Sequence, residues 1–406
     1  MRMILLISLT TLLPAFALTS ESVAQTRLPL SIMVRELETP SGVGTAEPNL
    51  TRGRDGLVYL SWIQKSPDTS HTLFVSRFDS VGWAPARPVA TGKNWFVNWA
   101  DFPSLAVGEG GTMLASWLER SGEDTYAYDV KLAMSYNGGR TWESAITPHD
   151  DNTETEHGFV SLAALPDREF AVIWLDGREM VKPDGPMTLR YARVDSDGKL
   201  HDDELIDGKV CDCCQTSMVR CGDGSLAVVY RDRHDDEVRD IAVLRHTADG
   251  WTKPAPLHID NWKIAGCPVN GPSLDSYERS VAASWFTMEG EDSARVYVAF
   301  SDDCGKSFGS PTRVDLGASL GRVDICLVDQ SRACVVWLQP DKGETKIMMR
   351  VVTPDGKTSN PISVGRTSAD RESGFPRIAY TGERIIIAWT DPSAGPRVRA
   401  AQLVLE

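Results

Sequence analysis

The sequence has no surplus of positive charge. Its 406 residues include 42 lysines and arginines against 56 aspartates and glutamates, which gives a formal net charge of −14 at pH 7. Nucleic-acid binding needs a basic surface that neutralises phosphates, and anionic membrane surfaces repel an acidic chain. We therefore expect neither nucleic acid nor a membrane surface as the partner of this protein.

The sequence also lacks any linker-like change in composition and any low-complexity segment. It contains no glycine-rich phosphate loop, no HExxH helix and no GxSxG nucleophile elbow, so the common signatures of nucleotide binding, zinc proteolysis and serine hydrolysis are missing. Length alone would suggest two or three domains, but long all-β folds are an exception to that rule. We expect a single domain.

Only the N-terminus carries a long apolar run. Arg2 precedes the run Ile4–Ala17, and the small residues Ser22-Val23-Ala24 follow it. This pattern is typical of a secretory signal peptide, here residues 1–24, and the run is short for a membrane span. An uncleaved N-terminal anchor is the alternative. We expect an exported mature chain without a membrane span, periplasmic or extracellular, in an oxidising compartment.

Aromatic residues mark seven copies of one unit. A short apolar run ends in an aromatic residue every 52 to 57 residues, at Trp62, Trp117, Trp174, Tyr230, Trp285, Trp337 and Trp389. In each copy a strand-like segment precedes the run that ends in the aromatic residue. After the aromatic residue come a third segment, with alternating apolar and polar residues, and a fourth, weaker strand-like segment. Four strands in a repeat of roughly 50 residues are typical of a β-propeller blade. The sequence predicts an all-β, seven-bladed propeller over residues 28–406, with six or eight blades as alternatives.

The two ends of the chain are expected to share a blade. The seventh copy reaches only its third strand by Glu406, whereas Leu28–Glu36 alternates like a strand and precedes the first copy. Pairing them would close the ring and hide its last sheet edges. In this topology the first strands line the channel. Loops between blades then share one face, the top face, with loops between second and third strands.

Two turns resemble a known repeat motif. Ser135–Trp142 and Ser301–Phe308 are similar to the Asp box, S-x-D-x-G-x-[ST]-[WF], with Asn137 in place of the aspartate in the first. The side chain of Asp or Asn can accept hydrogen bonds from turn amides, and glycine permits positive φ. The boxes resemble those of the sialidase superfamily, also called BNR-repeat proteins. For sialidases that resemblance implies a six-bladed β-propeller, whereas the seven aromatic marks indicate seven blades.

For sialidases proper, the resemblance implies glycoside hydrolysis. Three arginines would hold a carboxylate, a Tyr–Glu pair would supply the nucleophile, and an acidic residue would be the general acid. The early F/Y-R-I-P motif is missing, and only a scrambled form occurs at Phe375–Ile378. Top-face arginines could bind an anion, and neighbouring acids could transfer protons. In a hydrolase the candidates would be Arg178, Arg231, Arg233, Arg371, Asp176 and Asp232; salt bridges between blades are the alternative role.

Three neighbouring loops between blades carry an unusual set of residues. Cys211, Cys213 and Cys214 enter the fourth copy, Cys267 enters the fifth, and His157 enters the third. Consecutive blades are adjacent in space, so these side chains are expected to converge on the top face. Thiolates with imidazole favour soft or borderline ions such as Cu(I) or Zn(II). The sequence predicts a copper or zinc site.

Disulfide bonds are the alternative use of these cysteines. The chain has eight cysteines, an even number in a chain expected to be exported. Cys326 and Cys334 flank one turn symmetrically and could form a cross-strand bond. Cys221 and Cys304 both fall on the bottom face, with their pairing undetermined. Two disulfides among the four top cysteines would require bonds between near neighbours, which is poor geometry.

The histidines in acidic runs, His149, His201 and His234, are expected in exposed loops.

Taken with the cysteine loops, the repeat pattern predicts a non-hydrolytic, exported propeller whose Cys/His cluster binds a metal ion or a partner. The alternatives are a glycoside hydrolase of exo-sialidase type and a plain interaction scaffold. Its partner at the top face would be a small molecule, a glycan or a protein.

Overall fold

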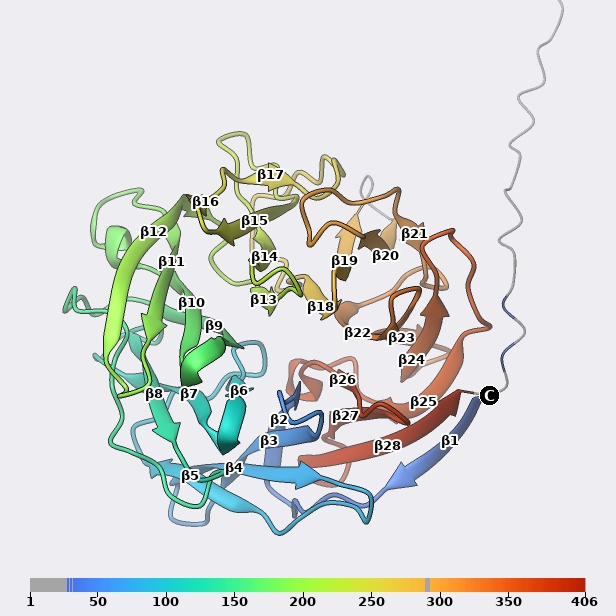
Figure 1. Ribbon diagram of the computed structural model, residues 1–406, viewed down its shortest axis with the longest axis horizontal. Coiled ribbons are helices and arrows are strands. Elements are labelled where there is room, and N and C mark those ends of the chain that lie inside the picture. The colour runs from blue at the N-terminus through green and yellow to red at the C-terminus, as the bar shows by residue number, and fades with distance from the viewer. Residues whose placement is uncertain (1–27, 29, 31, 289–292, 406) are drawn as a thin grey trace, which may run out of the picture.

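A computed structural model describes residues 28, 30, 32–288 and 293–405. The described strands form seven antiparallel sheets arranged in a ring (Figure 1). The prediction of a seven-bladed β-propeller is therefore confirmed. The predicted signal peptide, residues 1–24, lies outside the described residues. No helix within the described part of the chain is both long and apolar enough to cross a membrane.

The blades follow the order of the chain, and each begins with its innermost strand. The first four are β2 (Thr45–Arg52), β3 (Val58–Lys65), β4 (His71–Phe78) and β5 (Arg87–Gly92); β6 (Leu105–Val107), β7 (Met113–Arg120) and β8 (Tyr128–Ser135); β9 (His157–Ala164), β10 (Phe170–Asp176), β11 (Met187–Val194) and β12 (Leu200–Val210); and β13 (Ser217–Arg220), β14 (Leu226–Arg231), β15 (Ile241–Thr247), β16 (Gly250–Trp251) and β17 (Ala255–Pro256).

The remaining blades are β18 (Ser273–Tyr277), β19 (Ser280–Met288), β20 (Ala294–Ser301) and β21 (Thr312–Arg313); β22 (Gly321–Asp329), β23 (Arg332–Asp341), β24 (Glu344–Val352) and β25 (Ile362–Thr367); and β26 (Arg377–Tyr380), β27 (Ile385–Asp391), β28 (Arg397–Leu405) and β1 (Ile32–Leu37). Four short 3-10 turns lie in connections: η1 (Glu109–Gly111), η2 (Pro166–Arg168), η3 (Arg178–Val181) and η4 (Arg371–Ser373).

The chain ends close the ring as expected. β1 runs antiparallel to β28, with Ile32 opposite Leu405 and Leu37 opposite Ala400. Figure 1 shows β1, in blue, along the outer edge of the last blade, in red. The first and last segments of the described chain therefore share one sheet, and that sheet has no free outer edge at β28.

The repeat aromatics are the centres of the core. All seven are at most 5% exposed, and each lies on the second strand of its blade. They pack between blades rather than within one sheet: Trp174 of β10, for example, shares a hydrophobic cluster with Leu114 of β7. Burial of such large side chains stabilises each blade against its neighbour, by about 1.5–3 kcal/mol per residue. The periodic aromatics thus fix the number of blades.

The Asp-box turns lie at the bottom ends of β8 and β20. Asn137 Oδ1 accepts hydrogen bonds from the amides of Arg140 and Thr141, both at 3.0 Å, and Asp303 Oδ1 accepts one from Ser307 at 2.9 Å. Gly138 and Gly139 both adopt positive φ, as the turn requires. These contacts are local to the turns.

The second blade departs from the regular pattern. After β8 it has no fourth strand in the described chain, and only an isolated bridge joins Leu132 to Ile146. Residues 147–156 leave the sheet edge and reach the start of β9 at the top of the third blade. His149 and Asp151 of this segment therefore contact His157 on the top face. In a regular outer strand they would lie at the outer edge of the blade.

Candidate metal centre

Three of the four top-face cysteines, Cys211, Cys213 and Cys214, form one close group, and Cys267 joins it through Cys213. Cys211 Sγ lies 3.6 Å from Cys214 Sγ, and ligand atoms of Cys211, Cys213 and Cys214 all lie within 4.8 Å of one another. The Cys213 thiol is hydrogen-bonded to both of them and also to Cys267. Loop 211–216 of the fourth blade and loop 266–272 of the fifth thus present four sulfur atoms to one region. We call this set the thiol cluster.

Burial of the thiol cluster is graded. Cys211 and Cys214 are 1% and 2% exposed, Cys213 is half-buried, and Cys267 is exposed. A site of this kind excludes bulk water from two of its sulfurs and keeps a third at the surface. An ion or a partner can therefore reach the cluster from the side of Cys267.

The surroundings favour thiolates at two positions. Hydrogen bonds from the Cys213 and Cys214 thiols, with the charge of Arg231, hold the pKa of Cys211 well below its ordinary value. Arg239 Nη1 also donates to Cys211 Sγ at 3.3 Å. The hydrogen bond from Cys213 lowers the pKa of Cys267. Deprotonated sulfur is the form that ligates metals.

His157 lies in a second cluster, with its ring away from the sulfurs. Its Nε2 atom is 3.2 Å from Asp151 Oδ2 and 3.8 Å from Asp176 Oδ1. The two clusters lie near each other. Glu156 precedes His157 in the chain, and Asp212 lies between Cys211 and Cys213. Burial is the main cause that raises the pKa of Glu156 to about 7, and the charge of Asp212 raises it further. The predicted cysteines thus lie near one another, whereas His157 belongs to a carboxylate environment.

The prediction that His149 lies in an exposed loop is wrong. It is only 9% exposed, and its ring stacks on that of His157 with centroids 3.9 Å apart and planes 5° apart. The physical reason is the missing fourth strand of the second blade, which lets segment 147–156 fold over the top. His201 and His234 are exposed as expected.

The arginines proposed for a hydrolase have protein partners. Arg178 donates Nε and Nη2 to the two oxygens of Asp176, at 2.7 and 2.8 Å. Arg233 bonds to Glu237 at 2.8 Å and to Asp212 at 3.2 Å. These pairs are salt bridges, but each joins residues of one blade, whereas the expected alternative was salt bridges between blades.

The other hydrolase candidates are dispersed. Arg231 is 1% exposed and donates to the backbone oxygens of Asn270, Arg239 and Phe286. Asp232 Oδ2 is 3.2 Å from His234 Nε2. Arg371 is exposed in η4 of the last blade.

The remaining cysteines form two further pairs. Cys326 and Cys334 lie opposite each other on β22 and β23, as expected, and both are buried. Cys221 is hydrogen-bonded to Cys304 of the next blade. All eight cysteines are free thiols in the structure, so the predicted Cys326–Cys334 bond is not formed here.

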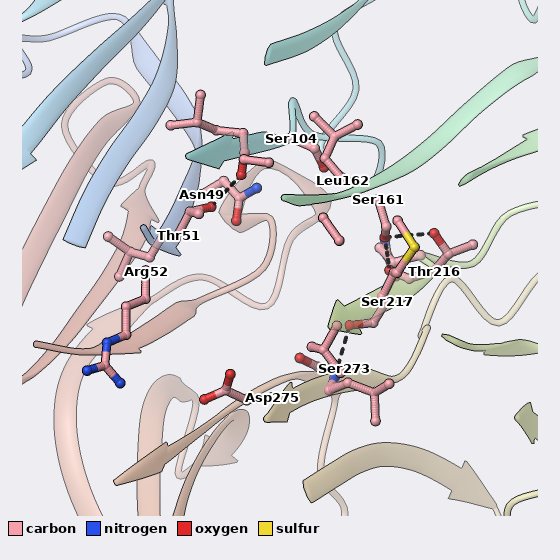
Figure 2. Close-up of a pocket in the computed structure, with 18 of the residues that line it drawn as sticks. Asn49, Thr51, Arg52, Ser104, Ser161, Leu162, Thr216, Ser217, Ser273 and Asp275 are labelled. Atoms are coloured by element: carbon pink, nitrogen blue, oxygen red, sulfur yellow. Dashed lines mark hydrogen bonds between the residues drawn. The ribbon is translucent and has the colours of Figure 1, made fainter. Parts of the chain in front are cut away.

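The central channel is a separate feature. It forms a cavity of about 430 Å³ lined by the innermost strands, as predicted. Figure 2 shows hydroxyl and amide groups around it, among them Asn49, Ser104, Ser161 and Thr216. Neither His157 nor any member of the thiol cluster is among the described residues that line the cavity. The candidate metal centre therefore lies beside the channel, over the third to fifth blades.

Sequence reasoning missed a buried acidic network beside the candidate centre. Tyr128 Oη donates to Glu156 Oε1 at 2.7 Å and lies 3.3 Å from Asp101 Oδ2. Burial raises the pKa of Asp101 to about 8 and that of Glu156 to about 7. No spacing in the sequence signals this network, because the residues come from different blades and meet only after folding.

The Asp101→Asn variant is expected to flatten the pH dependence of stability. A folded Asp101 keeps its proton up to about pH 8, whereas the unfolded carboxyl loses it near pH 4. The folded state binds more protons between these values, so stability falls as pH rises through that window. Burial lowers the pKa of His149 to about 4, which gives the opposite slope below pH 6.5.

The measurement is therefore the free energy of unfolding in urea at pH 6.5 and pH 8. Between them the parent should lose about 1–2 kcal/mol more than Asp101→Asn. Asparagine can still accept the Phe159 amide that Asp101 Oδ1 accepts at 2.8 Å, so the backbone contact survives. Equal losses in both proteins would show that Asp101 is ionised in the fold.

Comparison with known proteins yields a fold. No protein-family model and no curated protein matches the chain. A solved structure of a Dyadobacter fermentans protein of unknown function aligns over 92% of this chain and 99% of that chain, with a TM-score of 0.52 and 15% identity. A polysaccharide lyase of family PL25, an ulvan lyase, aligns over 90% of this chain and 95% of its own, with a TM-score of 0.56 and 9% identity.

A sialidase of Trypanosoma rangeli also aligns, over 80% of this chain and 56% of that chain, with a TM-score of 0.43 and 10% identity. The two alignments with TM-scores above 0.5, at 15% and 9% identity, show a shared fold and no more. Because one fold hosts many activities, function has to be argued from the site.

Proposed function

We propose that the protein is an exported, non-hydrolytic β-propeller that binds one soft or borderline metal ion, Cu(I) or Zn(II), through Cys211, Cys213, Cys214 and Cys267. The observation that carries this proposal is the 3.6 Å separation of Cys211 Sγ and Cys214 Sγ. Sulfurs that share a tetrahedral ion at about 2.3 Å lie about 3.8 Å apart. Disulfide sulfurs lie about 2.05 Å apart.

The charges around the cluster support the same proposal. Four thiolates around a divalent ion carry a net charge of −2, which a half-buried site has to offset. Arg239 bonds to Cys211 Sγ, and Arg231 acts on Cys211 and Cys214 through its charge. Glu237 fixes the Arg239 guanidinium by a 2.7 Å bond to Nη2. Two fixed guanidiniums thus balance the proposed thiolate centre.

The engaged arginines support a non-hydrolytic role. Arg178, Arg231 and Arg233 each spend several donors on protein oxygens, so they do not form a cradle for a substrate carboxylate. The exposed Cys267 offers a route by which an ion is delivered or handed on. We therefore favour metal binding or metal carriage over glycoside hydrolysis.

The test is metal loading of the reduced chain without air. Purified protein receives Zn(II) or Cu(I), excess ion is removed by dialysis, and bound metal and reactive thiols are counted together. We expect about one sulfur-bound ion per chain and protection of four thiols from a thiol-modifying reagent. An equal number of reactive thiols in the loaded and the metal-free protein, or top cysteines already bridged in the protein isolated from its host, would contradict the proposal.

A further inference from the structure

We infer that Asp151, His157 and Asp176 form a second cation site, at the top of the third blade. The site suits a divalent ion that accepts mixed nitrogen and oxygen ligands, and Zn(II) is the probe chosen here. This inference does not rest on the proposed function, because it uses none of the sulfur atoms.

The first observation is a fully buried imidazole whose Nε2 atom makes no hydrogen bond. His157 is 0% exposed, and Nε2 has no bonded partner although Asp151 Oδ2 lies 3.2 Å away. One ligand atom from each of Asp151, His157 and Asp176 lies within 4.8 Å of the others. Nitrogen and oxygen atoms that share an ion at about 2.1 Å are about 3.0–3.4 Å apart. The 3.2 Å between His157 Nε2 and Asp151 Oδ2 lies in this range. The 3.8 Å between His157 Nε2 and Asp176 Oδ1 has to shorten by about 0.4 Å when an ion binds.

The second observation concerns the other nitrogen of the same ring. His157 Nδ1 lies 3.2 Å from the Thr155 backbone oxygen and 3.3 Å from that of Tyr128. Backbone oxygens only accept, so Nδ1 carries a hydrogen. In the neutral ring the lone pair is then on Nε2 and faces two carboxylates. A positive charge has to lie between them, and metal-bound histidines typically donate their other nitrogen to a carbonyl in this way.

His149 brings a second imidazole to the same place, stacked on that of His157. Its Nδ1 atom is also 3.2 Å from Asp151 Oδ2, and its Nε2 atom is buried without a hydrogen-bond partner. Two imidazole rings therefore face the Asp151 carboxylate, His157 through Nε2 and His149 through Nδ1.

The local charges leave room for one more cation. Asp151, Asp176 and Asp203 bring three negative charges, whereas Arg178 and Arg190 bring two positive ones. The remaining charge is −1 in a region where Asp176 is 0% exposed. An uncompensated buried charge is costly, and a bound cation removes that cost.

Two fixed donors hold the Asp176 carboxylate in position. Arg178 bonds to both of its oxygens, and Trp174 Nε1 donates to Oδ2 at 2.7 Å. Hydrogen bonds of this kind orient the carboxylate ligands of metal ions. We therefore assign Arg178 and Trp174 a positioning role at the second site.

The experiment compares Zn(II) binding by equilibrium dialysis in the parent and three variants. His157→Gln removes the proposed nitrogen ligand, and Asp151→Asn removes a ligand charge at nearly constant shape. His201→Gln is the matched control, because His201 forms an exposed 2.7 Å pair with Asp195 at the bottom of the same blade. We expect His157→Gln and Asp151→Asn each to bind about one ion fewer than the parent, and His201→Gln to match it.

Asp151→Asn decides the question if His157→Gln fails to fold. Unchanged stoichiometry and affinity in Asp151→Asn would overturn the inference and leave a proton as the positive charge beside His157. A Cys213→Ser chain distinguishes the two proposals. If it loses an ion while Asp151→Asn does not, only the thiol site exists; if the reverse holds, only the second site exists.

Discussion

Replacement of Cys213 by serine is expected to abolish retention of the ion at the thiol cluster while the seven-bladed ring stays folded. The Cys213 thiol acts on the thiols of Cys211, Cys214 and Cys267, and its sulfur lies within 4.8 Å of the first two. A serine hydroxyl is a poor ligand for soft ions, which select thiolates. Structural zinc sites contribute about 10–16 kcal/mol, so loss of one of four ligands should weaken binding at least about 100-fold.

The fold should tolerate this change because Cys213 is a half-buried loop residue. Bound metal per chain and the thermal midpoint, each measured with and without added ion, separate the two effects. The parent should gain stability with the ion, since a ligand that binds only the folded state stabilises it by an amount that grows with the logarithm of its affinity. Cys213→Ser should show almost no such gain.

Cys326→Ala is the matched control for Cys213→Ser. It removes one thiol from the core between β22 and β23, and it should leave metal content unchanged. A Cys213→Ser chain that loses stability but keeps its ion would contradict the metal proposal and would support a disulfide at this position.

Arg231→Leu is expected to destabilise the protein by about 3–5 kcal/mol. The guanidinium donates to the Asn270 oxygen at 3.1 and 2.8 Å, to Arg239 at 2.6 Å and to Phe286 at 2.7 Å. It also lies over the Trp262 ring, 4.7 Å from its centroid. Leucine would leave these buried carbonyls unpaired, each at a cost of about 1–3 kcal/mol.

Urea unfolding of Arg231→Leu measures this loss, and Arg371→Leu is the control. Arg371 is exposed in η4, where surface substitutions usually change stability by less than about 0.5 kcal/mol. The result bears on function, because an arginine kept for a substrate carboxylate could be replaced at little cost in stability. A loss below about 1 kcal/mol in Arg231→Leu would contradict the structural role.

The fold was predictable because its signal is repeated. Each blade contributes a buried aromatic residue at nearly constant spacing, and Trp174, Trp285 and Trp337 are all 0% exposed. The closing strand was predictable for the same reason, since a copy that lacked one strand required a partner. Convergence of Cys211, Cys213, Cys214 and Cys267 followed from the rule that loops between consecutive blades share a face.

Side-chain direction was beyond the sequence at His157 and Arg231. His157 begins β9, and its ring turns toward Asp176 at the end of β10, so it joins a carboxylate cluster. Arg231 ends β14, and its side chain turns toward the oxygens of the next blade, away from solvent. Loop position predicted the face on which each residue lies, but packing between blades decided where the side chain points.

His149 was misplaced for a different reason. Its acidic surroundings are typical of an exposed loop, yet the second blade lacks a fourth strand and segment 147–156 crosses the top. The sequence signal that could have shown this is weak: the stretch after the first Asp box has little strand alternation. Recognition of that missing strand would have predicted that His149 and Asp151 lie beside His157 on the top face.

X-ray absorption spectroscopy of the reduced chain, loaded with one equivalent of Cu(I), identifies the atoms that hold the ion. Cu(I) selects sulfur, so it reports on the thiol cluster and not on the nitrogen and oxygen ligands of the second site. We predict a first coordination shell made of sulfur alone, which is lost in Cys213→Ser. A shell of nitrogen and oxygen atoms, or an ion that is equally well held in Cys213→Ser, would contradict the proposed function.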